Sequence, residues 1–334
     1  MLPPTAPRAI SGAPSKRERH AISLLSRENT LAYDPPELMG PSDQATRAVR
    51  RFSCVLGALA LLGCSEYDRQ AIEDNNSGMN LLRGGRLADA RDRFQRAADE
   101  DPKFDQPLYN LALVHTRQHE WGNAAEALTR AIARNPRNAE YHYQLGNAHF
   151  EQEHWEQARA AFNQALQVNG NLYMAHYRLG EVADHLDEPQ AALQAYTNAV
   201  TKAPRAYRAY VRLGRAYYRA HDYDRATQVL REGLRIAPEG AVERGSMHNI
   251  LGNVLLEQNH KEQAIEEFIA AHHDDVELAE ALFSAGYTSS EIPERRQQAI
   301  LYLQRFIEAR GGNAPREYLD IAQNRLAELQ NPAH

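Results

Sequence analysis

Four arginines with helical spacing are the residues of this sequence most suited to binding chemistry. Arg208, Arg212, Arg215 and Arg219 follow one another at steps of four, three and four residues, which places them along one face of a helix. Guanidinium groups bind carboxylates through paired hydrogen bonds, so this arginine face is suited to an extended peptide that carries carboxylates. The alternative is that these arginines only solvate an exposed helix, since charged stripes on exposed helices are common.

Patterns for catalysis, cofactors and metals are missing from the sequence. It contains no Gly-rich phosphate loop, no nucleophile with a base at a useful spacing and no paired carboxylates. Its two cysteines, Cys54 and Cys64, lie in one short apolar stretch, so nothing downstream can form a disulfide or a thiolate metal site. With 38 basic and 44 acidic residues, the net charge of −6 gives no bulk attraction to nucleic acid. We predict a non-enzymatic protein without cofactor or metal.

The first 63 residues have the pattern of an export signal behind an extension. Residues 1–46 are rich in Pro, Ser and Arg without periodicity, which predicts disorder. Residues 47–63 join a basic start to a short apolar run, which predicts a signal peptide because a spanning helix needs about 20 apolar residues. Since a signal seldom begins so late, we expect translation to start at Met39, with residues 1–38 outside the protein. The alternative is that residues 52–63 form a buried helix.

The end of the apolar run, Leu61-Leu62-Gly63-Cys64, resembles the lipobox of bacterial lipoproteins. This resemblance implies lipidation of Cys64, with diacylglycerol on the thiol and a fatty acid such as palmitate on the new amino group after cleavage. Several acyl chains give a stable membrane anchor. Ser65 resembles the residue of lipoproteins sent to the outer membrane, so we expect the periplasmic face of that membrane. Residues 64–70 would be a linker.

A period of 34 residues organises the rest of the chain. Leu145-Gly146, Leu179-Gly180 and Leu213-Gly214 recur at this spacing, as do alanines and prolines. The pattern resembles the tetratricopeptide repeat (TPR) family, which implies an all-α, right-handed α-solenoid of helix–turn–helix units. We expect about seven repeats over residues 71–312, with an insertion around Glu239–Glu243 before the sixth and a degenerate seventh. Residues 313–334 would be a capping helix and tail, because an open-ended stack needs a cap.

Each position of the repeat has a packing reason. One position on the first helix must be small so that the second helix can approach closely, and a large residue of the second helix fills the space beside it. The small position is occupied by Gly78, Ala112, Gly146, Gly180, Gly214 and Gly252, and the facing position of the second helix by Ala90, Ala124, Ala158, Ala192 and Ala226. A proline or Gly170 then ends each unit.

Histidines and tryptophans also recur with the repeat. His142, His176 and His248 share one position, and His115 and His149 share another, which in this family hold packed aromatics. We therefore interpret them as part-buried structural histidines and not as metal ligands. The two tryptophans, Trp121 and Trp155, are expected to close the core at equivalent turns. His272 to Asp275 is interpreted as a solvated turn.

In this family the first helices line a concave groove that binds peptides. The resemblance extends the predicted groove from the arginine face to upstream residues, namely Tyr143, Asn147, Phe150, Tyr177 and Arg178. Chaperone-binding members hold two carboxylates in a clamp. Asn147, Arg208 and Arg212 match part of that clamp, whereas Tyr143 and Arg178 depart from it. The expected partner is a protein, either an envelope or secretin component or an acidic peptide segment.

An anchored repeat protein of this kind resembles two groups of bacterial lipoproteins. One group is the type IV pilus pilotins, which help the secretin ring assemble in the outer membrane. The other comprises adaptors that recruit peptidoglycan hydrolases or proteases. We expect a scaffold of an envelope machine, with the pilus or a motility or secretion apparatus first, the adaptor second, and a regulatory or oligomerising subunit of an enzyme complex third.

Overall fold

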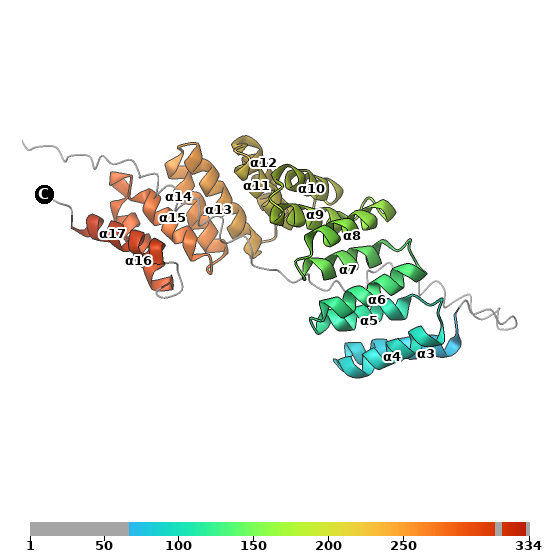
Figure 1. Cartoon of the computed structure of the whole chain (residues 1–334). Coiled ribbons are helices and arrows are strands. Elements are labelled where there is room, and N and C mark those ends of the chain that lie inside the picture. The colour runs from blue at the N-terminus through green and yellow to red at the C-terminus, as the bar shows by residue number, and fades with distance from the viewer. Residues whose placement is uncertain (1–66, 311–315, 332–334) are drawn as a thin grey trace, which may run out of the picture. The chain divides into compact units, whose positions relative to one another are not determined.

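The computed structural model describes residues 67–310 and 316–331 of the chain. Within these ranges every regular element is helical, and successive helices are joined by short turns (Figure 1). The prediction of an all-α repeat fold is therefore confirmed for the described residues. The predicted extension 1–46, the signal peptide 47–63 and the lipidation site Cys64 lie outside them. Among the described helices none is long and apolar enough to cross a membrane.

The helices divide into two compact units, one that ends at Asp187 and one that begins at Glu188. The helices of the first unit are α3 (Arg69–Arg83), α4 (Leu87–Glu100), α5 (Gln106–Arg117), α6 (Trp121–Arg134), α7 (Ala139–Phe150), α8 (Trp155–Val168) and α9 (Tyr173–His185). Those of the second are α10 (Pro189–Lys202), α11 (Tyr207–Arg219), α12 (Tyr223–Ile236), α13 (Val242–Glu257), α14 (Lys261–Asp274), α15 (Ala279–Ser289), the short 3₁₀ helix η1 (Pro293–Arg295), α16 (Arg296–Arg310) and α17 (Arg316–Gln330). Each unit is a stretch of α-solenoid.

The small position of the repeat allows the two helices of a pair to touch. A Cβ atom built on Gly146 of α7 would lie 2.4 Å from Cε1 of Phe162 on α8, well inside contact distance. The same relation joins three further pairs: Gly78 with Phe94, Gly214 with Leu230 and Gly252 with Phe268. The five alanines predicted to face this position are all buried. The predicted packing reason for the period is therefore what the structure shows.

Most turns between paired helices share a backbone feature that the sequence did not predict. Six of these turns contain one residue with a positive φ, between 55° and 73°, and successive members of this set are 34 or 38 residues apart. These residues are Gly85, His119, Glu153, Asp187, His221 and Asn259. In the second pair the amide of Glu120 then donates to the carbonyl of His115 at 2.9 Å, which closes the end of the helix. Only Gly85 is a glycine, so five of these turns hold a side chain in the left-handed region, at an energetic cost.

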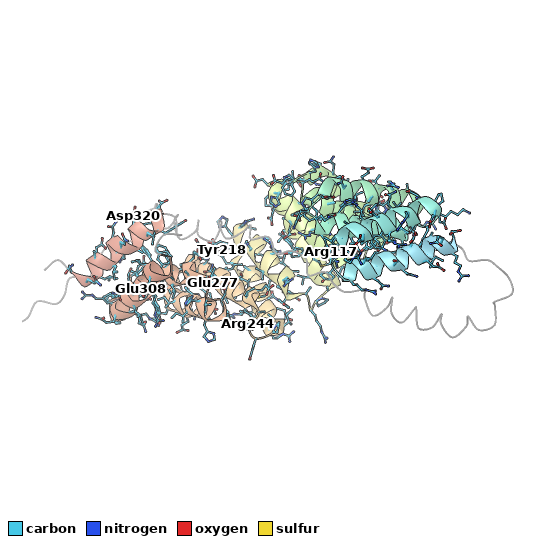
Figure 2. The ribbon with its side chains drawn as sticks, turned by 90° about the horizontal axis from the view of Figure 1, so that it is seen from below. Arg117, Tyr218, Arg244, Glu277, Glu308 and Asp320 are labelled. Atoms are coloured by element: carbon cyan, nitrogen blue, oxygen red, sulfur yellow. The ribbon has the colours of Figure 1, made fainter. Side chains whose placement is uncertain are left out.

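Arginines join successive repeats by capping helix ends. Arg134 of α6 donates to the carbonyls of Ala98 and Phe104 at 2.9 and 2.8 Å, and Arg117 donates to that of Leu82 at 3.0 Å. In the second unit Arg244 of α13 donates to the carbonyl of Leu234 at 2.9 Å. Figure 2 marks Arg117 and Arg244. Carbonyls in the last turn of a helix have no partner within it, so Arg134 and Arg244 supply a donor to those of Ala98 and Leu234. The carbonyl of Leu82 also accepts from the amide of Gly85 at 3.2 Å.

The last described helices, α15 to α17, pack as one further pair and a final helix, where the degenerate seventh repeat and the cap were expected. A Cβ atom built on Gly286 of α15 would meet Leu303 of α16 at 2.9 Å, so the pair closes with the partner one position later than in the other repeats. Tyr318 and Leu329 of α17 are buried against Phe283 and its neighbours. Part of the expected insertion forms helix, because α13 begins at Val242.

Candidate peptide-binding faces

The arginine face lies on the outward side of α11. Its opposite side is buried through Ala209, Tyr210, Leu213 and Tyr217. Arg208 and Arg219 are exposed, whereas Arg212 and Arg215 are half-buried. The predicted stripe therefore exists as one face of one helix, and its middle lies deeper than its ends.

Arg208 is joined to the next repeat by an ion pair. Its Nε lies 2.6 Å from Oε1 of Glu243, on the first turn of α13. The Glu243 side chain is 12% exposed and that of Arg208 is 44% exposed. A carboxylate of a bound peptide would therefore compete with Glu243 for Arg208, and the arginine face is partly occupied before any partner binds.

Three of the upstream residues predicted for the groove are buried in the first unit. Tyr143, Phe150 and Arg178 are at most 9% exposed. Nη1 of Arg178 donates to Oε2 of Glu181 at 2.9 Å, and its guanidinium lies 5.0 Å from the centre of the Phe150 ring. Arg178 is therefore engaged within the fold and does not line an open groove.

The protonation of this cluster follows from its environment. Burial lowers the pKa of the Arg178 guanidinium, but the negative charge of Glu181, together with Tyr143 and Tyr177, outweighs it and raises the pKa above its usual range. Burial raises the pKa of the Tyr143 hydroxyl. Arg178 therefore stays charged at neutral pH, and Tyr143 stays neutral. Such a pair stabilises the packing of α9 only while both partners remain.

The other upstream residues are more accessible. Asn147 is half-buried, and its Nδ2 donates to Oε1 of Gln144 at 3.2 Å. Tyr177 on α9 is half-buried as well. These residues on α7 and α9 belong to the first unit, whereas the arginine face on α11 belongs to the second. Of the residues predicted for the groove, the exposed charged side chains are those on the arginine face of α11.

The repeated histidines have structural partners. Nε2 of His142 lies 3.0 Å from the carbonyl of Pro136, and Nδ1 of His115 lies 2.6 Å from a carboxylate oxygen of Glu120. His248 lies between Glu267, at 2.6 Å, and Asp274, at 3.6 Å. Among the described residues, no group of three or more His, Cys, Asp or Glu is placed to hold a metal ion.

The tryptophan Trp155 and the segment from His272 to Asp275 both make specific contacts. Trp155 stacks on His185 with ring centres 4.0 Å apart, in agreement with a packing role for the tryptophan. The segment from His272 to Asp275 is not only a solvated turn, because Asp274 pairs with Arg244 at 2.9 Å. Arg244, on the first turn of α13, donates the hydrogen bond to the Asp274 carboxylate.

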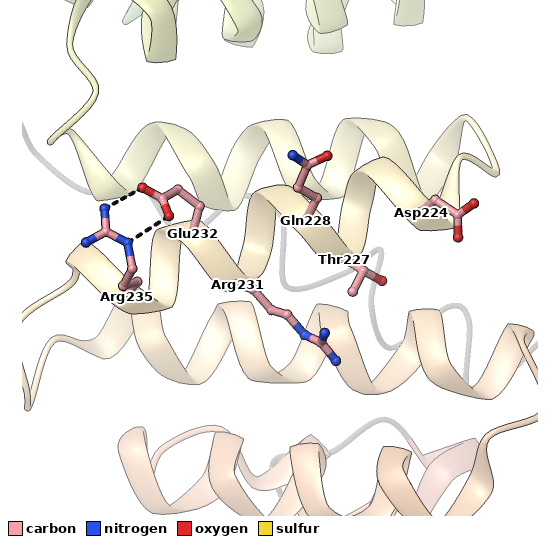
Figure 3. Close-up of a pocket in the computed structure, with 6 residues that line it drawn as sticks. All are labelled: Asp224, Thr227, Gln228, Arg231, Glu232 and Arg235. Atoms are coloured by element: carbon pink, nitrogen blue, oxygen red, sulfur yellow. Dashed lines mark hydrogen bonds and ion pairs between the residues drawn. The ribbon is translucent and has the colours of Figure 1, made fainter.

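A second surface feature lies on the outward face of α12 and was not predicted. It is a shallow hollow of about 570 Å³, shown in Figure 3 and lined by Asp224, Thr227, Gln228, Arg231, Glu232 and Arg235. Arg235 pairs with both oxygens of Glu232, at 2.8 and 2.6 Å. All its lining residues come from one helix, so the hollow is a groove beside a helix and not an enclosed site.

Comparison with known families decides what the repeat is. A family model described as tetratricopeptide repeat matches residues 76–139, 109–171 and 143–197, and a second with the same description matches residues 186–244. The chain belongs to the tetratricopeptide repeat family. Members of this family generally act as scaffolds for protein–protein interaction, and the TPR chain described here is such a scaffold. A search of curated proteins finds no match.

Solved structures resemble the TPR chain in fold. One is the C-terminal part of a TPR protein from Cytophaga hutchinsonii, with 12% identity over 73% of this chain and 98% of that chain, at a TM-score of 0.60. A TPR protein from Parabacteroides merdae has 15% identity over 79% and 100%, at 0.53. PilF from Pseudomonas aeruginosa has 17% identity over 77% and 98%, at 0.51. Identities this low establish the likeness of fold alone.

Proposed function

We propose that this chain is a lipid-anchored TPR scaffold of the bacterial envelope that helps a multisubunit machine to assemble, with the type IV pilus secretin as the first candidate. The main support for the proposal is that the lipobox stands directly before the repeat fold in the sequence. The lipobox residues Leu61 to Cys64 are followed, after only Ser65 and Glu66, by the described fold at Tyr67. The anchor and the binding scaffold are thus adjacent, as in a protein that works at a membrane surface.

The choice of the pilus secretin has two supports. The sequence resembles the type IV pilus pilotin lipoproteins in combining a lipobox with a stack of repeats. The fold of PilF from Pseudomonas aeruginosa aligns with 77% of this chain and with 98% of its own length. At 17% identity this likeness transfers no residue roles, so the proposed partner rests on architecture.

The proposed binding surface is the arginine face of α11. Exposed guanidinium groups at Arg208 and Arg219, with Arg212 and Arg215 between them, suit carboxylates spaced along an extended segment. About 11 residues of helix separate the two ends, which corresponds to about 16 Å at 1.5 Å per residue. An extended acidic segment of about five residues covers that length.

Deletion and capture experiments test the proposal. Loss of the gene should reduce secretin multimers in the outer membrane and surface pili, and the intact gene should restore both. Unchanged multimers and pili would exclude the pilus machine. Affinity capture from solubilised envelopes then identifies the partner directly. Recovery of a peptidoglycan hydrolase or a protease in place of the secretin would favour the adaptor role.

A further inference from the structure

The first described residue, Tyr67, follows the proposed anchor Cys64 by three positions. The ring of Tyr67 stacks on that of Phe104, with ring centres 4.6 Å apart. The backbone amide of Asp68 donates to Oδ2 of Asp101 at 2.8 Å. These contacts attach the chain to the loop between α4 and α5 before α3 begins at Arg69. Tyr67 is therefore already part of the first repeat.

Local hydrogen bonds make this attachment firm. Oδ1 of Asp68 accepts from the amides of Gln70 and Ala71 at 2.8 and 3.3 Å and so caps the start of α3. Oδ1 of Asp101 accepts from the amide of Lys103 at 2.8 Å. The amides of Asp68 and Lys103 lower the pKa of the Asp101 carboxyl, so this carboxylate is charged at neutral pH. The start of α3 and the loop at Asp101 thus form one end of the first repeat.

The tether between the anchor and this end is short. Cys64 and Tyr67 are three residues apart, and a fully extended chain spans at most about 3.6 Å per residue, or about 11 Å in total. The headgroup region on each side of a bilayer is about 5–8 Å thick. A lipidated Cys64 lies at that region, so Tyr67 stays within about 11 Å of the headgroup layer.

We propose that one end of the first repeat lies against the lipid headgroups. This end, called the membrane-facing end, is formed by residues 67–70 and 101–104. The turn at Gly84–Arg86, at the other end of α3, points away from the headgroups. This inference rests on the proposed lipidation of Cys64. Helix α3 has 15 residues, so the turn lies about 22 Å from the membrane-facing end along the helix.

The exposed side of α3 supports this end-on arrangement. Glu73, Asn76 and Asn80 are exposed on it, so it carries polar groups and lacks the apolar stripe of a helix that lies in the membrane surface. The membrane-facing end has mixed charge, with exposed Arg69 and Lys103 beside exposed Asp68 and Glu100. It therefore has no strong attraction for anionic lipid. The short tether to Cys64, and not electrostatic attraction, keeps this end at the headgroups.

Fluorescence quenching in vesicles tests the proposal. The full chain is produced in bacteria that process lipoproteins, with either Lys103→Cys or Arg86→Cys. Both positions are exposed. Cys54 leaves with the signal and the thiol of Cys64 carries lipid, so the new cysteine is the one free thiol for an NBD label. The vesicles contain phosphatidylethanolamine, phosphatidylglycerol and a lipid with a nitroxide on its headgroup.

We expect the label at position 103 to lose about half of its fluorescence or more and the label at position 86, about 22 Å further away, to lose little. A flexible Gly-Ser insertion of about 20 residues between Glu66 and Tyr67 spans about 25 Å on average and should remove the difference. Equal quenching at both positions in the uninserted chain, or stronger quenching at position 86, overturns the proposal. A difference that survives the insertion also overturns it, because the tether would not be the cause.

Flotation of the same vesicles separates this inference from the proposed function. If the protein floats with the vesicles and both labels are quenched equally, the anchor stands and the arrangement is wrong. If the protein does not float, Cys64 carries no lipid and both proposals fail. The same cysteine variants produced without residues 1–64, and so without Cys54, Cys64 and the signal, give the reference for an unanchored chain, in which neither label is quenched.

Discussion

Nε of Arg208 lies 2.6 Å from Oε1 of Glu243, so the first arginine of the arginine face on α11 is already paired with the next repeat. Arg208 remains 44% exposed in this pair. A partner carboxylate can reach it only in competition with Glu243. The pair therefore links the strength of binding at α11 to an acid on α13.

Removing this acid should strengthen the binding of acidic peptides. We expect Glu243→Gln to increase the affinity for fluorescein-labelled hexaglutamate by about threefold, since competing ion pairs of this exposure contribute under about 1 kcal/mol. Fluorescence anisotropy measures the change. Glu239→Gln, at an exposed position before α13, removes the same charge without touching Arg208 and serves as the control. Equal gains in both variants would mean that only net charge matters.

Charge reversal at the exposed end of the arginine face should weaken binding. We expect Arg219→Glu to lower the affinity for the same peptide by about tenfold, in line with the loss of a charge-assisted hydrogen bond of about 1.5 kcal/mol. The control is Arg231→Glu, on the outward face of α12, which is also exposed. Thermal unfolding should be nearly the same for both variants. If Arg231→Glu weakens binding as much as Arg219→Glu, the arginine face has no special role.

The close approach of paired helices predicts opposite effects at two glycines. Gly146→Ala places a Cβ atom 2.4 Å from the Phe162 ring and should lower the free energy of unfolding, by about 1–3 kcal/mol. Gly122→Ala in α6 meets nothing nearer than 3.8 Å and should raise it, by up to about 1 kcal/mol. Urea unfolding followed by circular dichroism measures both. A stable Gly146→Ala variant would contradict the packing reason given for the 34-residue period.

The positive-φ turns predict a stabilising substitution. Glu153 has a φ of 58°, so Glu153→Gly should relieve backbone strain and raise the free energy of unfolding, by about 1 kcal/mol. Gly85 has a φ of 73° with no atom within 4 Å of an added Cβ, so Gly85→Ala should lower it through the backbone alone. Parallel urea titrations compare the two. If both changes act in the same direction, strain at this turn is not the cause.

Removal of an arginine cap should destabilise the first unit. Arg134→Ala leaves the carbonyls of Ala98 and Phe104 without the donor that the structure provides, and we expect a loss of about 1–3 kcal/mol. Arg137→Ala, at an exposed position three residues further along, is the matched control. Hydrogen exchange of the amides in α4 and α6 should increase in the first variant and not in the second. Equal exchange in both would show that the cap contributes nothing.

The repeat fold could be predicted from the sequence because its period is set by packing. Gly146 must be small for Phe162 to approach, and that demand leaves a glycine or alanine at a fixed spacing. The final helix was predictable from a similar pattern, since Tyr318 and Leu329 repeat with the period of a helix and are buried on one side of α17.

The turns between paired helices were not predictable, because only Gly85 among their six positive-φ residues is a glycine. The packing of the other turns imposes that conformation on His119, Glu153, Asp187, His221 and Asn259 against their local preference.

The candidate site could be predicted only in part. The arginine face of α11 follows from helical spacing, and the structure places it on one side of the helix. The burial of Arg178 was missed, although Glu181 one turn later on α9 was the available signal for an internal ion pair. The pairing of Arg208 with Glu243 joins residues 35 apart in the chain, and no local pattern predicts it.

Site-specific photo-crosslinking in living cells tests the central claim most directly. A photoreactive amino acid replaces either Arg219 on the arginine face of α11 or Arg231 on the outward face of α12, in the full chain with its native N-terminal region. We predict that the residue at position 219 crosslinks to an acidic segment of an envelope protein, with the secretin first. The residue at position 231 should give no such product. Identical products at both positions, or none at position 219 in membranes that contain the protein, would contradict the account.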